Sequence, residues 1–260
     1  MISLASWWWP KRPGRVPRAR TAVLLTGLGA ALFGVAALLL KAGAVGGDVS
    51  LFRILNQVPA AAAASVLTPL SHLFLPAGIL AVVVLAVVYV VARNRSVLPL
   101  AAGAVAASLA WGLAHVAKAV ADRPRPYEVM AGAVLRQQPA HGTSFPSSHT
   151  AVTLAVAIAL VPFLARPFAA VGIGYAVLVG WSRVYLGVHY PLDVLAGAGL
   201  GMAAGGVIVL AAGILIRRAG RTANSHNAAT EVQAPGPAPS PAAVEKSGRR
   251  RASRGRWRRP

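Results

Sequence analysis

The chain has 260 residues, of which 56% are hydrophobic and 12% are charged, where an ordinary soluble domain carries about 25% charged residues. This composition excludes a typical soluble globule and indicates an integral membrane protein. The formal net charge is +20, but sixteen of the 26 Lys and Arg residues lie in the first twenty residues or after Ile216. The chain contains no cysteine, which excludes disulfides and thiolate metal sites.

The first predicted membrane span is Thr21–Leu40, twenty uncharged residues bracketed by Arg20 and Lys41. At 1.5 Å per residue, a helix of this length crosses a hydrocarbon core of about 30 Å. A cleaved signal peptide is the alternative, but its apolar region is only about 7–15 residues long. The sequence therefore favours a retained transmembrane helix.

Five further uncharged stretches bring the predicted number of spans to six, and they are Leu73–Ala92, Ser96–Ala117, Thr150–Ala165, Pro167–Ser182 and Val194–Ile216. The fourth and fifth are short, and each is completed at one end by a polar residue near the membrane surface, His149 or Arg183. Residues 45–69 are expected to form a helix along the interface. The predicted fold class is thus an all-α, polytopic membrane protein with six transmembrane helices in a bundle.

The basic residues predict the orientation of this bundle. With six spans both termini lie on one side, and a cytoplasmic placement puts 19 basic residues inside and seven outside, as the positive-inside rule requires. We therefore expect a multi-pass protein of the cytoplasmic membrane with both termini in the cytoplasm.

Three regions follow from this division: a basic N-terminal arm (1–20), a membrane domain (21–216) and a C-terminal tail (217–260). Ser, Ala and Pro dominate the tail, which ends in a segment with seven arginines, Arg249–Arg259. Such a composition cannot build a core and predicts disorder. We expect the tail to bind anionic lipids of the inner leaflet rather than nucleic acid.

The last span carries Gly197, Gly201 and Gly205 at a spacing of four residues. A helix face of this kind lets another backbone approach closely. Packing inside the bundle is the favoured interpretation, and homodimerisation through the same face is the alternative.

Three clusters of polar residues stand out from the apolar chain. They are Lys118 with Arg125-Pro126, then Phe145-Pro146-Ser147-Ser148-His149-Thr150, and finally Ser182-Arg183 with His189 and Asp193. The predicted topology places all three at the outer membrane surface. The sequence therefore predicts one site assembled from distant segments.

The chemistry of these clusters indicates a phosphate site. Lys118, Arg125 and Arg183 supply three positive charges, and a guanidinium grips phosphate oxygens through paired hydrogen bonds. Ser147 and Ser148 precede a helix, whose first-turn N–H groups bind anions. Three cations would also repel a divalent metal ion, so no metal site is expected.

Two imidazoles complete the predicted site. His189 and Asp193 are four residues apart, so on a helix the carboxylate can hold one ring nitrogen and leave the other free to attack. His149 is then available to protonate the leaving oxygen. This arrangement is typical of nucleophilic catalysis assisted by a general acid.

The ordered motifs K-x6-RP, PSxH and SR-x5-H-x3-D resemble those of the type 2 phosphatidic acid phosphatase superfamily, over roughly Asp48 to Ile216. The resemblance implies that Lys118, Arg125, Ser147, Ser148 and Arg183 bind the substrate phosphate. It implies a catalytic group made of the nucleophile His189, which forms a phosphohistidine, the general acid His149 and the orienting carboxylate Asp193. It also implies catalysis without metal or other cofactor. Ser148 stands where the family motif commonly has glycine.

Other polar residues receive structural interpretations. Arg123 and Arg136 are interpreted as helix anchors that snorkel to the membrane surface. Neutralisation of Lys118 by Asp122, four residues later, is left open. Packing is the favoured interpretation for the lone histidines, His72 and His115. Contact with substrate is left open for His141 and Tyr127.

The predicted function is an integral membrane lipid phosphatase that hydrolyses a phosphate ester or anhydride at the outer membrane face. An outward site and a short loop between the first two motifs suit a polyprenyl diphosphate, such as undecaprenyl or decaprenyl diphosphate. Phosphatidic acid phosphatase, phosphatidylglycerol phosphate phosphatase and lipid phosphotransferase are the enzymatic alternatives. The alternative of another class is a membrane scaffold whose basic tail binds lipid.

Overall fold

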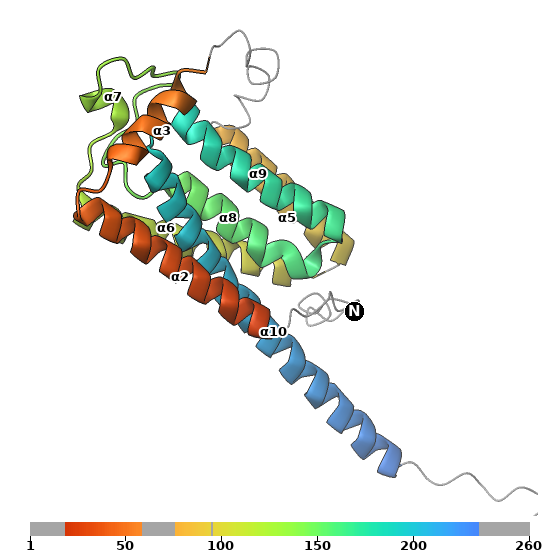
Figure 1. The fold of residues 1–260 in the computed structure, drawn as a ribbon. Coiled ribbons are helices and arrows are strands. Elements are labelled where there is room, and N and C mark those ends of the chain that lie inside the picture. The colour runs from red at the N-terminus through yellow and green to blue at the C-terminus, as the bar shows by residue number, and fades with distance from the viewer. Residues whose placement is uncertain (1–18, 59–75, 95, 234–260) are drawn as a thin grey trace, which may run out of the picture. The chain divides into compact units, whose positions relative to one another are not determined.

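The computed structural model describes residues 19–58, 76–94 and 96–233, and its regular elements in these ranges are helices (Figure 1). In chain order they are α2 (Ala19–Lys41), α3 (Gly46–Asn56), α5 (Pro76–Asn94), α6 (Leu98–Ala121), α7 (Pro126–Val129), α8 (Ser148–Leu160), the 3-10 turn η1 (Val161–Phe163), α9 (Arg166–Tyr185) and α10 (Pro191–Gln233). This confirms the all-α class for the described residues. Almost all of the N-terminal arm, His72 and the end of the tail lie outside them.

Four helical segments of the described chain are long and apolar enough to cross a membrane: Ala19–Lys41, Leu98–Val129, Arg166–Tyr185 and Pro191–Arg218. At the place of the predicted fourth span lies a shorter apolar helix, Ser148–Phe163, which is not one of these four. The second predicted span corresponds to α5, which begins at Pro76. A multi-pass protein is therefore supported, while six spans and cytoplasmic termini stay predictions.

The outward faces of these helices are apolar. Large side chains there are mostly exposed, as for Leu38 on α2 (67%), Leu85 on α5 (68%), Val116 on α6 (68%) and Val171 on α9 (69%). In a water-soluble protein, so much exposed apolar surface marks an interaction site or promotes aggregation. On a membrane protein the same faces contact lipid tails.

The interior of the bundle is built from alanine. Alanines of α6 and α8 recur at spacings of four residues and meet α10 in one cluster, which contains Ala106, Ala110, Ala114, Ala151, Ala155, Ala159, Leu200 and Ala204. Small side chains allow close helix packing, which stabilises bundles where lipid removes the hydrophobic driving force. Helix α6 accordingly packs along α8.

The glycines of α10 pack inside the bundle, which confirms the favoured interpretation. A methyl group at Gly201 would lie 2.6 Å from the carbonyl oxygen of Ala151 on α8. On another face of α10, a methyl group at Gly199 would lie 2.6 Å from the backbone nitrogen of Phe33 on α2. Helix α10 therefore touches two helices through backbone.

The last helix is longer than the sequence indicates. The final span is expected to end at Ile216, but α10 continues to Gln233. The segment after Ile216 has several good helix formers and no proline before Pro235, which permits a longer helix. By compactness the chain divides after Ile216 into two units, and the site lies in the first.

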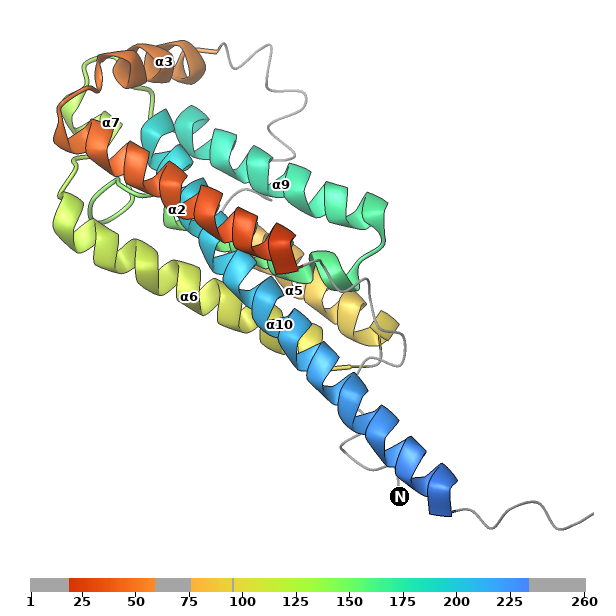
Figure 2. The same cartoon turned by 60° about the horizontal axis from the view of Figure 1, so that its bottom comes forward.

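Several helix ends meet at the site. Figures 1 and 2 show α3 and α7 at the same end of the bundle. Asn56, the last residue of α3, is fully buried, and its side-chain nitrogen donates to the carbonyl oxygens of Val134 (3.0 Å) and Tyr185 (3.1 Å). Asn56 thereby fastens α3 to the end of α9.

Candidate active site

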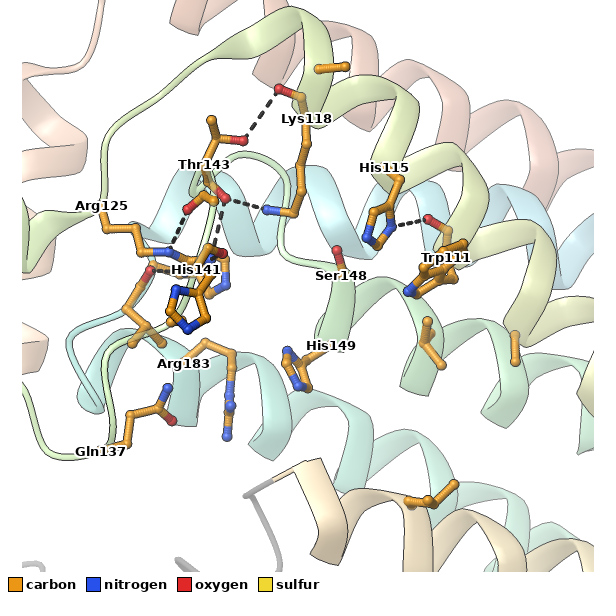
Figure 3. A pocket seen from close by; sticks show the side chains of 18 residues that line it. Trp111, His115, Lys118, Arg125, Gln137, His141, Thr143, Ser148, His149 and Arg183 are labelled. Atoms are coloured by element: carbon orange, nitrogen blue, oxygen red, sulfur yellow. Dashed lines mark hydrogen bonds between the residues drawn. The ribbon is translucent and has the colours of Figure 1, made fainter.

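A cavity of about 760 Å³ brings together residues of all three polar clusters. The predicted site residues that line it are Lys118, Arg125, Ser148, His149, Arg183 and His189 (Figure 3). Ser147 and Asp193 are fully buried and support its wall. The three motifs, separated by many residues in sequence, thus form one site.

The cations of the first cluster shape the loop that precedes α8. Lys118, in the last turn of α6, donates from Nζ to the carbonyl oxygens of Thr143 (2.5 Å) and Ser144 (3.3 Å). The Arg125 guanidinium donates to the carbonyl oxygens of Gly142 (2.9 Å), Val188 (2.9 Å), His141 (3.0 Å) and Thr143 (3.4 Å). An ammonium has three N–H donors and a guanidinium five. Each cation therefore keeps a donor beyond these bonds for a ligand.

The second cluster starts α8. Ser147 is the N-cap, and its Oγ accepts hydrogen bonds from the Thr150 backbone nitrogen (3.5 Å) and from Thr150 Oγ1 (3.0 Å). Ser148 behaves differently, because its Oγ is buried at the cavity wall without a hydrogen-bond partner among the described residues. A buried hydroxyl of this kind is costly unless a ligand satisfies it.

The third cluster surrounds the turn between α9 and α10. Gly187 in this turn has φ +83°, and a side chain there would meet the Val134 backbone. Arg183, in the last turn of α9, is almost fully buried and donates to Ser182 Oγ (3.3 Å). The turn carries His189 into the cavity wall.

His189 lies beside Asp193, although it precedes α10, which begins at Pro191. Nδ1 of His189 lies 3.5 Å from Oδ2 of Asp193 and makes no hydrogen bond among the described residues. Burial lowers the pKa of His189 to about 4, although the Asp193 carboxylate opposes this effect. The imidazole is therefore neutral near pH 7, as attack by a ring nitrogen requires. Because Nδ1 faces the carboxylate, Nε2 is the nitrogen available to substrate.

The interpretation of Arg123 and Arg136 as snorkelling anchors is wrong. Arg123 is buried and donates from Nη1 to Asp193 Oδ1 (2.7 Å) and from Nη2 to Asp48 Oδ2 (2.6 Å). Arg136 donates to the carbonyl oxygen of Tyr185 (2.7 Å) and lies over its ring, 4.3 Å from the centroid. The Arg123 guanidinium is bound to two carboxylates and does not reach water, while the half-buried Arg136 lies in the loop before α8 and not at the end of a membrane helix.

Asp48 and the apolar end of the cavity were missed by sequence reasoning. Asp48 is one of only six acidic residues, and in so basic a chain each acid is worth examining as a partner of a buried cation. The apolar lining comes from α5, α6 and α8 and includes Leu80, Ala107, Trp111 and Val152. These residues are indistinguishable in sequence from lipid-facing ones.

The remaining polar candidates are also placed. His115 packs against Trp111 with the ring planes tilted by 36° and the centroids 3.9 Å apart, and its Nδ1 lies 2.9 Å from the Trp111 carbonyl oxygen. His115 and His141 line the cavity, whereas Tyr127 donates to the Ala140 carbonyl oxygen (2.8 Å). Asp122 is exposed and ends α6 in a left-handed conformation. Among the described residues, no three His, Asp and Glu side chains are arranged to hold a metal ion.

Comparison with known sequences identifies relatives of the region that carries this site. Residues 96–216 match the PAP2 superfamily. The undecaprenyl-diphosphatase of Sulfolobus acidocaldarius is 38% identical over 89 residues, which cover 34% of this chain and 43% of that protein. The undecaprenyl-diphosphatase BcrC of Bacillus subtilis is 44% identical over 52 residues, covering 20% and 26%. The matches thus span less than half the length of these curated relatives.

Two solved structures share the fold. LpxE of Aquifex aeolicus superposes with a TM-score of 0.52 and 28% identity, over 61% of this chain and 92% of that chain. A transmembrane PAP2 type phosphatidylglycerolphosphate phosphatase from Bacillus subtilis gives a TM-score of 0.52 and 24% identity, over 70% and 94%. The second likeness supports the fold alone.

Proposed function

Since this chain belongs to the PAP2 superfamily, in its membrane lipid phosphatase branch, we propose that it removes a phosphate group from a polyprenyl diphosphate at the outer face of the cell membrane. The observation that carries the proposal is the cavity itself. It joins three cations and two histidines to an apolar wall formed by α5, α6 and α8. A lipid with a phosphorylated head group has this combination of chemistry.

The geometry suits catalysis in two steps. The terminal phosphate binds near Lys118, Arg125 and Arg183, which neutralise its charge. Nε2 of His189 attacks phosphorus, so an N–P bond forms as the bond to the leaving oxygen breaks, and His149 gives that oxygen a proton. Water then attacks the phosphohistidine while His149 takes a proton back, which releases phosphate and restores both histidines.

The relatives named undecaprenyl-diphosphatase support the choice of lipid. The apolar wall suits a substrate whose lipid tail is bound in addition to its phosphate group. Ser148 Oγ, unpartnered among the described residues, supplies a hydroxyl donor where the family motif commonly has glycine.

The proposal is tested with purified protein in detergent and a panel of lipid phosphates: undecaprenyl diphosphate, phosphatidic acid and phosphatidylglycerol phosphate. Released phosphate and lipid products are both measured, with and without EDTA. We expect hydrolysis fastest for the polyprenyl diphosphate, unchanged by EDTA and absent in His189→Ala.

Three outcomes would contradict parts of this proposal. No phosphate release by the folded wild type from any lipid of the panel would support a scaffold whose motif residues have no catalytic role. Transfer of phosphate to a lipid or sugar hydroxyl would indicate a phosphotransferase. Loss of turnover in EDTA, restored by one divalent ion, would show that a metal takes part.

A further inference from the structure

Arg123 connects the carboxylate beside the nucleophile to a second buried carboxylate. Its Nη1 lies 2.7 Å from Asp193 Oδ1 and its Nη2 lies 2.6 Å from Asp48 Oδ2. The guanidinium carbon also lies over the ring of Tyr190, 3.8 Å from its centroid. The side chains of Arg123 and Asp48 are each only 7% exposed, and that of Asp193 is fully buried. Solvent therefore screens this row of charges little.

Asp48 lies far in sequence from Arg123 and Asp193. It lies in the first turn of α3, outside the residues 96–216 that match the superfamily. Its second oxygen, Oδ1, accepts a hydrogen bond from the backbone nitrogen of Leu192 in the first turn of α10 (2.7 Å). Asp48 thus contacts both Arg123 and the helix that carries Asp193.

These contacts fix the Asp193 carboxylate at both oxygens. Oδ1 accepts from Arg123, while Oδ2 accepts from the Tyr190 backbone nitrogen (2.8 Å) and faces His189. A carboxylate held at both ends has little freedom to turn away from the imidazole. The orientation of His189 therefore depends on partners that never touch substrate.

The net charge of Asp48, Arg123 and Asp193 decides how strongly these residues stabilise a positive charge on His189. Asp48 and Asp193 each carry a negative charge and Arg123 a positive one, which leaves one net negative charge beside a ring that becomes cationic when phosphohistidine forms. Without Asp48, the charge of Arg123 would cancel that of Asp193 at the nucleophile. Without Arg123, two carboxylates would be buried unpaired.

We propose that Asp48 and Arg123 are positioning residues for the phosphoryl transfer, holding Asp193 so that His189 keeps its reactive tautomer and orientation. This inference rests on the proposed function, because it assumes that His189 is the nucleophile. It assigns a part in the reaction to α3, which lies outside the region shared with the superfamily.

The test compares Asp48→Asn, Arg123→Met and the double variant in the full-length protein. Two charged residues that are exposed in the structure, Asp122 and Arg53, provide the controls Asp122→Asn and Arg53→Gln. Monodispersity and thermal unfolding in detergent identify variants that fold. For these, kcat, KM and the pH dependence of kcat/KM are measured with the best lipid substrate of the panel.

We expect each single variant to lose about tenfold or more in kcat with KM nearly unchanged, as for a group that acts only on the reacting state. The pH dependence gives a signature that a merely structural role would not produce. Removing the negative charge of Asp48 shifts the acid limb of kcat/KM to lower pH, and removing the positive charge of Arg123 shifts it to higher pH. The double variant restores the net charge, so its acid limb returns toward that of the wild type.

The opposite shifts are informative because the other groups near His189 stay unchanged in all variants. The charged and titratable side chains that face it or line its cavity are Asp193 on α10, Lys118 and His115 on α6, Arg125 at the start of α7, His141 in the loop before α8, His149 on α8 and Arg183 on α9. If Arg123→Met does not fold, Arg123→Lys takes its place. Lys keeps the positive charge but hydrogen-bonds well to only one of the two carboxylates. We therefore expect a lower kcat and an unshifted acid limb of kcat/KM.

Folded single variants with wild-type kcat, or acid limbs that move in the same direction, would overturn the inference. Failure of the proposed function is distinguishable, because it would appear as an inactive wild type or as an active His189→Ala. An active wild type, an inactive His189→Ala and unaffected Asp48 and Arg123 variants would reject the positioning role alone.

Discussion

His149 and His189 line the same cavity from different elements, the first turn of α8 and the turn before α10. Because they are held by different elements, one imidazole is able to carry the phosphoryl group while the other transfers protons. The carboxylate of Asp193 lies beside His189. This asymmetry supports His189 as the nucleophile and His149 as the proton donor.

The two roles are separated by changing the leaving group. With a lipid substrate, His149→Ala should lose about 10²–10⁴ in rate, because the leaving oxygen needs a proton. With an aryl phosphate, whose leaving group needs little protonation, His149→Ala should recover much of that loss. His189→Ala should recover nothing and should trap no labelled phosphate.

Steady-state rates on both substrates and acid-quenched labelling measure these effects. Labelled phosphate on His189→Ala, or recovery of that variant with the aryl phosphate, would show that the roles are reversed.

Ser148 is the second residue whose surroundings predict an effect. Its buried Oγ faces the cavity without a partner among the described residues, and a hydrogen bond to a charged phosphate contributes about 1.5–3 kcal/mol. Ser148→Ala should therefore raise KM about tenfold or more. Thr153→Val is the matched control, because the Thr153 hydroxyl already donates to the His149 carbonyl oxygen of its own helix (2.7 Å). Equal KM values in wild type and Ser148→Ala would exclude the contact with substrate.

At the scale of elements, the position of the site depends on close contact between α8 and α10. Gly197 of α10 packs against the Ser147 carbonyl, at the residue that caps α8, and Gly201 packs one turn further along. The start of α8, with Ser148 and His149, is therefore placed by backbone packing. A side chain at these glycines would move the helix that presents the general acid.

Gly201→Ala tests this dependence, since the added methyl group would lie 2.6 Å from the Ala151 carbonyl oxygen. Overpacking of this kind costs about 1–3 kcal/mol, so we expect a lower unfolding temperature in detergent and lower kcat. In contrast, Gly174 on α9 has no atom within 4 Å of an added methyl group. Gly174→Ala should stabilise the helix by about 0.5–1 kcal/mol and leave kcat unchanged. Equal melting of both variants would refute the packing argument.

The elements and the site were predictable to different degrees. Apolar stretches predicted the helices, and the motif spacing predicted that Lys118, His149 and His189 meet. The hydrogen bonds from Lys118 and Arg125 to the loop before α8 were not predictable. Their acceptors are backbone carbonyl oxygens, which every residue has, so no residue type signals them.

The pairing of Arg123 with Asp48 was missed for another reason. The two residues are 75 positions apart, and Asp48 belongs to no motif. A charged residue near a helix end is usually an anchor, so the sequence favoured the ordinary interpretation. Only the folded arrangement, with α3 over the start of α10, shows that Arg123 has two buried partners.

At the scale of the molecule, the orientation in the membrane decides which pool of lipid the site reaches. The distribution of basic residues predicts an outer site, and the exposed apolar faces of the helices support insertion in a bilayer. An outer site reaches the head groups of lipids in the outer leaflet, whereas a cytoplasmic site would reach those of the inner leaflet.

Single cysteines in this cysteine-free chain measure the orientation directly. Ala131 lies exposed in the loop between the first two clusters, and Ala131→Cys should react with an impermeant thiol reagent in intact cells. Ala229→Cys, after the last predicted span, should react only after lysis. The reverse pattern would place the site in the cytoplasm and would remove the argument for a lipid released outside.

The contact between α2 and α10 also has a consequence for biosynthesis. Gly29 of α2 packs against the Ala203 backbone, and Gly199 of α10 packs against Phe33, so the earliest and latest of the described helices share a seam. The ribosome completes α2 before α10, so the face of α2 that carries Gly29 has no α10 to pack against during synthesis. A chain that stops short of α10 therefore leaves this close backbone contact unmade.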